Sequence, residues 1–166
     1  MRFSSRLVAF TSVISALTVA LSAVAIPFML GVRIHFFQVG VMLAGVVGGP
    51  FSGLVTGAIG GVYVAWLRSD PTIVVGNGLL GLFAGIFARR MRPALAAVAA
   101  WALIQAPWIY LTGTFIFGVP AVVMQLVLTL LTIEDVACAL VVDLLVTHFN
   151  VRELVLPKPR VTIQVP

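Results

Sequence analysis

The 166-residue chain is 61% hydrophobic and only 9% charged, and it carries a net charge of +5. Soluble domains are about 25% charged, so this chain lacks the polar side chains to cover a water-facing surface and fits the integral membrane class. Its one cysteine, Cys138, excludes a disulfide framework and a multi-cysteine metal or redox site. The basic residues lie in short loops and tails, which membrane topology explains better than nucleic-acid binding.

Six apolar blocks follow one another along the chain. A helix needs roughly 17–25 residues to span the hydrocarbon, and the predicted spans are residues 7–30, 36–47, 51–67, 72–88, 94–111 and 119–146. The second span is short, and Gly48-Gly49-Pro50 separates it from the third, a sequence typical of a tight turn between antiparallel helices. The alternative is five spans, with residues 36–67 forming one bent or re-entrant segment.

Basic residues are strongly biased to one side of the six-span topology. That side holds Arg2, Arg6, Arg89, Arg90, Arg92, Arg152, Lys158 and Arg160, whereas the other side holds Arg33 and Arg68. Cytoplasmic loops carry an excess of Lys and Arg, so we expect both termini in the cytoplasm. The prediction is an all-α integral membrane protein, a compact bundle of about six transmembrane helices. It forms a single domain over residues 1–166, with a short polar C-terminal tail from about residue 150.

The first block also has features of a secretory signal peptide. Arg2 and Arg6 precede an apolar stretch, and Ala23-Val24-Ala25 has the small residues of a cleavage site. We favour a retained helix, because the apolar run is longer than an ordinary signal core. Its removal would also leave an odd number of spans with a weaker charge bias.

Glycines crowd the second, third and fourth spans. Gly53, Gly57 and Gly61 recur every four residues and form a groove along one helix face, as expected where helices approach closely in lipid. A less regular glycine surface follows on the fourth span. A nucleotide-binding loop is not expected, because no strand pattern precedes these glycines and no Lys-Ser or Lys-Thr follows them.

These features together resemble the substrate-binding S components of energy-coupling factor (ECF) transporters, which are vitamin importers built on six helices. Residues 41–61 contain Gly48-Gly49-Pro50-Phe51-Ser52-Gly53 followed by Gly57, similar to the Leu-Gly-Pro-x-x-Gly-x-x-x-Gly turn and helix of that family. Residues 77–90, ending in Arg89-Arg90, are similar to its fourth span and basic cytoplasmic loop. The chain departs from many relatives at Gly60-Gly61, where an acidic residue often follows the small-residue run.

The resemblance implies a subunit that binds a vitamin or related small metabolite on the outer side, under the loop between helices one and two. It implies a multi-pass protein of the cell membrane whose partners are a transmembrane T component and two ATPase subunits. The implied docking residues are Ser12, Ala16, Ala20, Arg89 and Arg90. The first three are equally compatible with packing inside the chain's own bundle.

Polar side chains within apolar spans usually face a cavity or another helix. Asn77, Gln105 and Gln125 lie at one level, about 7–9 Å below the outer edge at 1.5 Å per residue. The candidate substrate-binding residues are Arg33, Asn77, Gln105, Trp108, Tyr110, Gln125 and Glu134. The alternatives are interhelical hydrogen bonds for the amides, an interfacial position for Tyr110 and a helix-flanking role for Arg33. His35 is expected at the interface, and no second His or Cys lies at metal-binding spacing.

The sixth span carries three of the five acidic residues, Glu134, Asp135 and Asp143. At 100° per residue they cannot all face one pocket. Asp143 is expected to pair with Arg152 or a loop arginine near the cytoplasmic edge. Glu134 or Asp135 is costly at membrane depth, so we expect one of them to contact the substrate or stabilise its cavity.

The leading functional hypothesis is therefore a substrate-capture subunit of an ECF-type importer, with no catalytic role, cofactor, metal site or nucleic-acid partner. One alternative is a structural or assembly protein of the membrane, for which the glycine surfaces suffice. A small lipid-modifying enzyme is less favoured, because such enzymes need clustered carboxylates or an activated nucleophile. Arg33 suits an anionic group, Glu134 a cationic one and the aromatic residues any flat ring, so the sequence leaves the substrate open.

Overall fold

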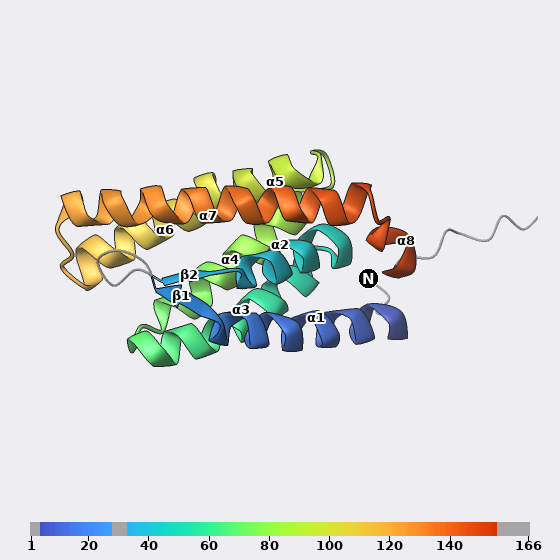
Figure 1. The fold of residues 1–166 in the computed structure, drawn as a ribbon, viewed down its shortest axis with the longest axis horizontal. Helices are drawn as coiled ribbons and strands as arrows, with labels where there is room; N and C mark the ends of the chain where they lie inside the picture. The colour runs from blue at the N-terminus through green and yellow to red at the C-terminus, as the bar shows by residue number, and fades with distance from the viewer. Residues whose placement is uncertain (1–3, 28–32, 156–166) are drawn as a thin grey trace, which may run out of the picture.

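The computed structural model describes residues 4–27 and 33–155, without the side chains of Ala25, Pro27, Arg33 and Leu154. Six helical segments run along the long axis and alternate in direction (Figure 1). They are α1 (Ser5–Ala23), α2 (Phe37–Gly48), α3 (Pro50–Arg68), α4 (Thr72–Phe87), a composite fifth segment (Pro93–Ile116) and α7 (Ala121–Thr147). This confirms the predicted all-α membrane bundle. Within the described residues, four segments are long and apolar enough to cross a membrane, whereas α2 and α4 are shorter.

The first helix is shorter than the predicted span 7–30. It ends at Ala23, Val24 adopts an extended backbone, and Ala25–Pro27 forms strand β1. Proline lacks an amide hydrogen and disfavours helical backbone in the residue before it, so Pro27 prevents the helix from continuing. Strand β1 pairs antiparallel with β2 (Arg33–His35), with Ile26 opposite Ile34. Residues 28–30 of the predicted span lie outside the described residues.

Residues 36–67 form two helices, as the six-span hypothesis predicts. Helix α2 ends at Gly48 and α3 begins at Pro50. Between them Gly49 has φ 89° and ψ 177°, a backbone conformation that is essentially restricted to glycine. Proline is well suited to the first position of a helix because its missing amide hydrogen has no intrahelical role there. The predicted tight turn is therefore confirmed.

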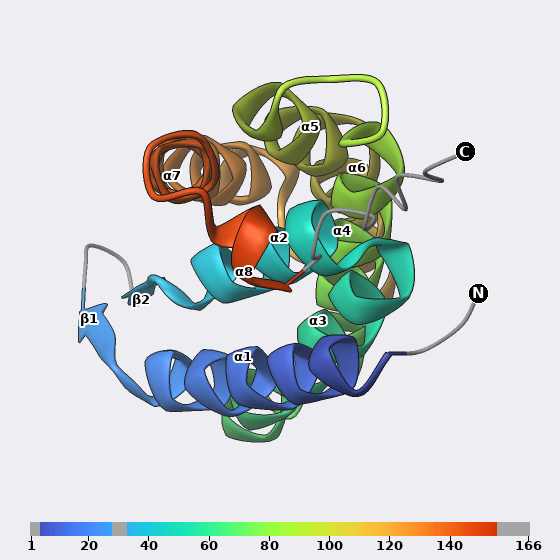
Figure 2. The same ribbon diagram turned by 90° about the vertical axis from the view of Figure 1, so that its right-hand side faces the viewer.

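Helix α2 is the central element of the bundle. Ten of its twelve residues are buried, and Figure 2 shows it surrounded by α1, α3, α4, α5 (Pro93–Ala100) and α7. Twelve residues correspond to about 18 Å of helix, less than the roughly 30 Å of a hydrocarbon core. The β1–β2 hairpin connects α1 to α2 and lies at one end of the bundle.

Glycines bring the backbones of α2, α3 and α4 into direct contact. A Cβ atom added at Gly53 would collide with the carbonyl oxygen of Gly81, and one added at Gly57 would collide with that of Asn77. Gly45 of α2 lies against the backbone of Gly81 in the same way. The predicted glycine surfaces are therefore helix-packing surfaces.

Helix α1 packs on α3 through hydroxyl groups. The Thr11 and Ser52 hydroxyl oxygens lie 2.8 Å apart, and those of Ser15 and Thr56 lie 2.9 Å apart. Each pair satisfies both side chains away from water, where an unpaired hydroxyl would be costly.

The fifth segment extends five residues beyond its predicted end at 111. It consists of α5, a π-helical turn η2 (Trp101–Gln105), α6 (Ala106–Leu111) and a second π-helical turn η3 (Thr112–Ile116). Single π-helical turns inside helices are often found at functional sites. The connection to α7 is correspondingly short.

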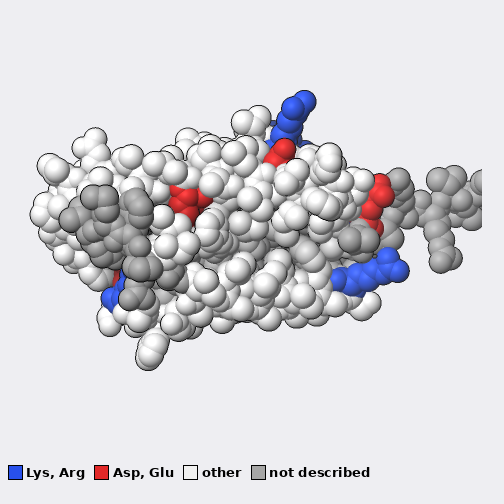
Figure 3. Space-filling view, viewed as in Figure 1, with Lys and Arg blue, Asp and Glu red and all other residues white. Residues whose placement is uncertain are grey.

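The start of α1 and the short helix α8 (Val151–Val155) lie at the same end of the bundle (Figure 1). The tail predicted from about residue 150 thus begins with a helix, and Val155 packs into the hydrophobic core. On the face in Figure 3, Lys and Arg side chains appear in the right-hand part and near the left-hand end, with a broad surface free of them between. The assignment of the shared end to the cytoplasm stays a prediction.

Candidate functional site

A cavity of about 360 Å³ lies at the end of the bundle that holds the hairpin and the turn between α3 and α4. This volume is within the roughly 300–1,000 Å³ typical of small-molecule sites. Its polar lining residues are His35, Gln38, Arg68, Asp70, Thr72, Asn77 and Thr112. Its aromatic lining residues are Phe37, Trp108 and Phe117, and most of the others are aliphatic. The cavity therefore combines flat apolar surfaces with several hydrogen-bonding groups.

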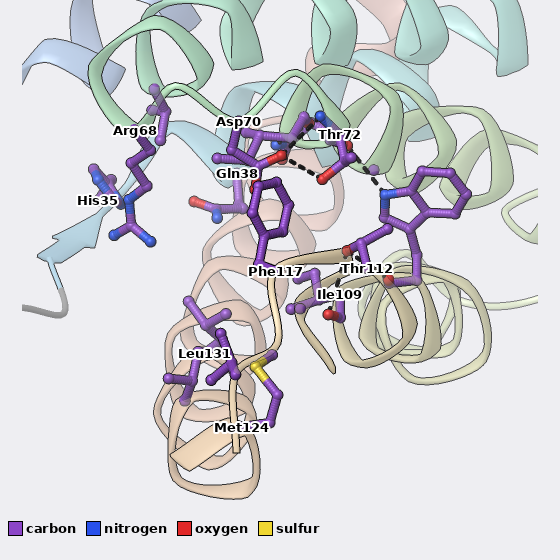
Figure 4. Close-up of a pocket in the computed structure, with 18 of the residues that line it drawn as sticks. His35, Gln38, Arg68, Asp70, Thr72, Ile109, Thr112, Phe117, Met124 and Leu131 are labelled. Carbon is purple, nitrogen blue, oxygen red and sulfur yellow. Dashed lines mark hydrogen bonds between the residues drawn. The ribbon is translucent and has the colours of Figure 1, made fainter. Parts of the chain in front are cut away.

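The side chains converge on this cavity from separate elements. Figure 4 shows Arg68 and His35 on one side, Met124 and Leu131 of α7 on another, and the Phe117 ring pointing toward Gln38 and Thr72. The first turn of α4 forms a further edge. There Asp70 Oδ1 accepts hydrogen bonds from the Thr72 amide at 2.9 Å and the Thr72 hydroxyl at 2.5 Å (Figure 4), which satisfies donors at the helix start.

Asn77 and Gln105 form a buried amide pair at the cavity. Gln105 Nε2 donates to Asn77 Oδ1 at 3.2 Å, and Asn77 Nδ2 donates to the Ile73 carbonyl oxygen at 2.9 Å. Asn77 lines the cavity, whereas Gln105 lies behind it. The two bonds fix which way the Asn77 amide faces, because turning it over would place like groups together. Gln105 Oε1 has no hydrogen-bond partner within the described residues.

The inward position of Gln105 follows from the π-helical turn η2. The Ala106 amide bonds to the carbonyl oxygen of Trp101, five residues back, instead of the four of an α-helix. Pro107 follows and has no amide hydrogen to continue the ladder. The wider turn leaves Trp101 and Gln105 both buried, and Trp101 Nε1 donates to Thr132 Oγ1 of α7 at 3.1 Å.

Trp108 joins the fifth segment to α4. Its Nε1 donates to the Thr72 carbonyl oxygen at 3.0 Å, and its own carbonyl oxygen accepts from the Thr112 hydroxyl at 2.9 Å. Both bonded residues line the cavity with it. The indole is therefore held against the first turn of α4.

Glu134 connects α7 to the hairpin. Its Oε1 accepts from the backbone N–H of His35 at 3.1 Å. In the amide orientation that satisfies its neighbours, Gln38 donates to the same Glu134 oxygen at 3.1 Å and to the His35 carbonyl oxygen at 3.0 Å. Glu134 is only 5% exposed and thus holds two cavity-lining residues from behind.

Asp135 and Asp143 have different surroundings. Asp135 is 1% exposed, and neither of its carboxylate oxygens has a hydrogen-bond partner in the described part of the chain. Asp143, expected to pair with an arginine, accepts from the Ala94 amide at 3.2 Å at the start of α5. Across residues 4–27 and 33–155, no group of three or more His, Cys, Asp or Glu side chains is arranged to hold a metal ion.

The structure gathers four of the seven candidate substrate-binding residues. Asn77 and Trp108 line the cavity, while Gln105 and Glu134 bond to lining residues. Tyr110 is two residues beyond Trp108, which is about 200° around a helix, and it is 37% exposed. Gln125 lies beside buried Met124 and is exposed on α7. For Arg33 the backbone is part of β2, but its side chain lies outside the described residues.

Several lining residues escaped the sequence analysis. Gln38 was detectable as the polar side chain of the short second span, and His35 was expected only at the interface. Arg68 and Thr112 lie at the ends of predicted spans. Their common position at the cavity depends on contacts between elements distant in sequence.

The predicted docking residues lie on the outside of the bundle. Ser12, Ala16 and Ala20 are exposed on α1, on the side opposite its buried Ile14, Ser15 and Thr18. Arg89 and Arg90 are exposed in the connection between α4 and α5. These residues are thus accessible, and their role in docking stays a prediction.

Comparison with known protein families gives a match over most of the chain. The family model described as ECF-type riboflavin transporter, S component, matches residues 2–151. No curated protein and no solved structure matches the chain. The matched region includes all six helical segments and the whole cavity.

Proposed function

The chain belongs to the family of ECF-type riboflavin transporter S components, and from this premise we propose that the cavity beneath the hairpin is a riboflavin site. The family makes it a substrate-binding subunit of a transporter and a multi-pass membrane protein, not an enzyme. The identity of the substrate and the residues that bind it are the proposal.

The observation that carries the proposal is the composition of the cavity wall. Riboflavin has a flat, largely apolar ring system with a polar pyrimidine edge and a chain of hydroxyl groups. Phe37, Trp108 and Phe117 supply aromatic surface for such a ring. Gln38, Asn77 and Thr112 supply amide and hydroxyl groups within the same cavity, as expected where a few polar groups orient a mainly apolar ligand.

The polar groups that we assign to ligand binding are held in place before the ligand arrives. The Asn77 amide is fixed by Gln105 and by the Ile73 carbonyl oxygen, and the Gln38 amide is fixed by Glu134 and His35. Such preorganisation lowers the entropy cost of binding. Gln105 and Glu134 are therefore assigned as positioning residues, with Asn77 and Gln38 in contact with the ligand.

Delivery into the cell requires the partners that the family implies, a transmembrane T component and two ATPase subunits. We assign the exposed face of α1 around Ser12, Ala16 and Ala20 as the surface for the T component, since small side chains permit close helix approach in lipid. Arg89 and Arg90 lie at the end of the bundle where α1 begins and are assigned to the same contact.

Riboflavin titration of the purified protein tests the ligand assignment, with quenching of flavin fluorescence as the signal. Trp108→Ala should weaken binding by about tenfold or more, since aromatic contacts and buried area contribute one to several kcal/mol. Trp66→Ala is the matched control, because Trp66 is 75% exposed on α3. If riboflavin does not bind the wild-type protein, or if both variants bind equally well, the assignment of this cavity is wrong.

The docking assignment is tested by copurification with the T component and the ATPases. Ala16→Leu places a larger side chain on the exposed face of α1 and should reduce the amount of complex recovered. Ala102→Leu makes the same change at an exposed alanine of the fifth segment and should leave the complex intact. A stable assembly with other membrane proteins, formed without a bound metabolite, would instead support the structural or assembly alternative.

A further inference from the structure

Gly76 and Trp108 are in direct contact at the cavity wall. A Cβ atom added at Gly76 would lie 2.8 Å from Trp108 Cδ1 and 3.2 Å from Trp108 Nε1. Gly76 is buried, and both residues line the cavity. The indole thus occupies the space that any side chain at position 76 would need.

The indole is also anchored one turn earlier on α4. Trp108 Nε1 donates to the Thr72 carbonyl oxygen at 3.0 Å, and Thr72 is itself bonded to Asp70 Oδ1. Residues 72 and 76 lie on the same face of a helix, so the ring lies along that face between them. Because its single N–H is already used, the indole offers the cavity only its apolar ring.

The surroundings of Gly76 differ from those of the helix-packing glycines. The atoms nearest a Cβ at Gly81 belong to the backbone of Gly53, and those nearest a Cβ at Gly85 belong to the backbone of Pro50 and Gly45. At Gly76 the three nearest atoms all belong to the Trp108 ring. Its missing side chain therefore shapes the cavity wall rather than the approach of two helices.

We propose that Gly76 is a positioning residue of the cavity, because it leaves the space in which the Trp108 indole forms a fixed, flat wall for a planar ligand ring. The choice of riboflavin as the probe rests on the proposed function. The contact between Gly76 and Trp108 does not depend on it.

The consequence of a single methyl group follows from the distances. In Gly76→Ala the indole must shift away from the added methyl group, which disturbs its hydrogen bond to the Thr72 carbonyl oxygen and the shape of the cavity wall. Alanine is a better helix former than glycine, so the substitution does not weaken α4 by itself. Gly78→Ala is the matched control on the same helix, since its Cβ would meet the flexible end of Leu54 at 3.2 Å.

The experiment measures riboflavin affinity for the wild-type protein, Gly76→Ala, Gly78→Ala, Trp108→Ala and the double variant Gly76→Ala/Trp108→Ala. We expect about tenfold weaker binding for Gly76→Ala and less than about twofold for Gly78→Ala, where tenfold corresponds to about 1.4 kcal/mol. The double variant should bind like Trp108→Ala, because the methyl group acts only through the indole. Wild-type affinity in Gly76→Ala, or independent effects of the two substitutions, would overturn the proposal.

Near-ultraviolet circular dichroism of the ligand-free protein separates this inference from the identity of the ligand. Gly76→Ala should change the tryptophan signal of the wild-type protein but not that of a Trp108→Phe background. If riboflavin fails to bind while this change is present, the ligand assignment is wrong and the proposed contact between Gly76 and the Trp108 indole is supported. If Gly76→Ala leaves the tryptophan signal of the wild-type protein unchanged, the proposed role of that contact is wrong.

Discussion

The two halves of the bundle are held together by different means. In α2, α3 and α4, glycines remove side chains from the interface, so backbone lies on backbone at Gly53 and Gly81. Between the fifth segment and α7, side chains fill the interface: the Met124 side chain packs on Gly113, and Trp101 Nε1 donates to the Thr132 hydroxyl. The cavity lies along the border of the two halves, with Asn77 on one side and Met124 on the other.

This difference separates a rigid part from an adjustable part. Backbone atoms cannot rotate away from a neighbour, whereas side chains such as methionine can change rotamer to fit a new shape. A binding site built on a rigid support keeps its polar groups in position. The side-chain contacts between the fifth segment and α7, such as Met124 on Gly113, can adjust to a ligand, whereas Gln105 and Trp108 are held by hydrogen bonds to α4.

The largest effect is expected from a substitution inside the rigid half. Gly53→Ala places a methyl group against the carbonyl oxygen of Gly81, which cannot move without separating α3 from α4. We expect a loss of about 1–3 kcal/mol in the free energy of unfolding, measured by denaturation in detergent. Gly113→Ala is the comparison in the adjustable half, where the added atom meets the Met124 side chain. Equal losses in the two variants would contradict the distinction.

A smaller effect is expected at the connection between the hairpin and α7. Glu134→Ala removes the carboxylate acceptor of the His35 amide and one of the two acceptors of the Gln38 amide, at a cost of about 1 kcal/mol, the low end of the range for buried groups that lose a partner. Hydrogen exchange should show faster exchange of the His35 amide. Glu134→Gln keeps an acceptor oxygen of similar shape and should preserve most of the protection. Unchanged exchange in Glu134→Ala would show that the carboxylate does not hold the hairpin.

A still smaller effect is expected on riboflavin binding, where two substitutions distinguish the ligand-contacting residue Asn77 from the positioning residue Gln105. Asn77→Ala removes the amide that lines the cavity, whereas Gln105→Leu removes only the bond that orients it. We expect riboflavin affinity to fall by about tenfold for Asn77→Ala, which loses a hydrogen bond to the ligand, and by about threefold for Gln105→Leu, which only weakens that bond. Isothermal titration provides the measurement, and a larger loss in Gln105→Leu would reverse the two assignments.

The smallest effect is expected at Gln125. Its side chain is exposed on α7, so Gln125→Ala should change riboflavin affinity by less than about twofold, as is usual for surface positions. The same titration serves as the measurement. A tenfold loss would mean that α7 turns in the ligand-bound state.

The features that could be predicted from the sequence are those set by neighbouring residues. The tight turn at Gly49 follows from Gly48-Gly49-Pro50, and the packing surfaces follow from the four-residue spacing of Gly53, Gly57 and Gly61. Pro27 was a readable signal for the end of α1, but the apolar run around it favoured a longer helix. In each case the deciding information lies within a few positions of the chain.

The candidate site was less predictable because its geometry depends on distant contacts. Asn77, Gln105 and Trp108 were predicted site residues because they are polar or aromatic groups in apolar spans. The position of Gln105, however, depends on a π-helical turn that the spacing of apolar residues does not reveal. Glu134 is connected to the cavity through its hydrogen bond to the backbone amide of His35, a hairpin residue 99 positions earlier in the chain.

Helix α1 is inside out by the standards of a soluble protein. Its hydroxyl side chains, Ser15, Thr18 and Ser22, are buried, while Val13 and Leu17 are 69% and 49% exposed. In water such a helix would gain by rotating its apolar side inward. Surrounded by hydrocarbon it gains nothing from that rotation, and its hydroxyls need hydrogen-bond partners. Ser15 pairs with Thr56 of α3, whereas Thr18 and Ser22 donate to the Ile14 and Val19 carbonyl oxygens of α1 itself. The orientation of α1 is therefore set by the bilayer as much as by the chain, and removing the lipid removes part of the reason for the fold.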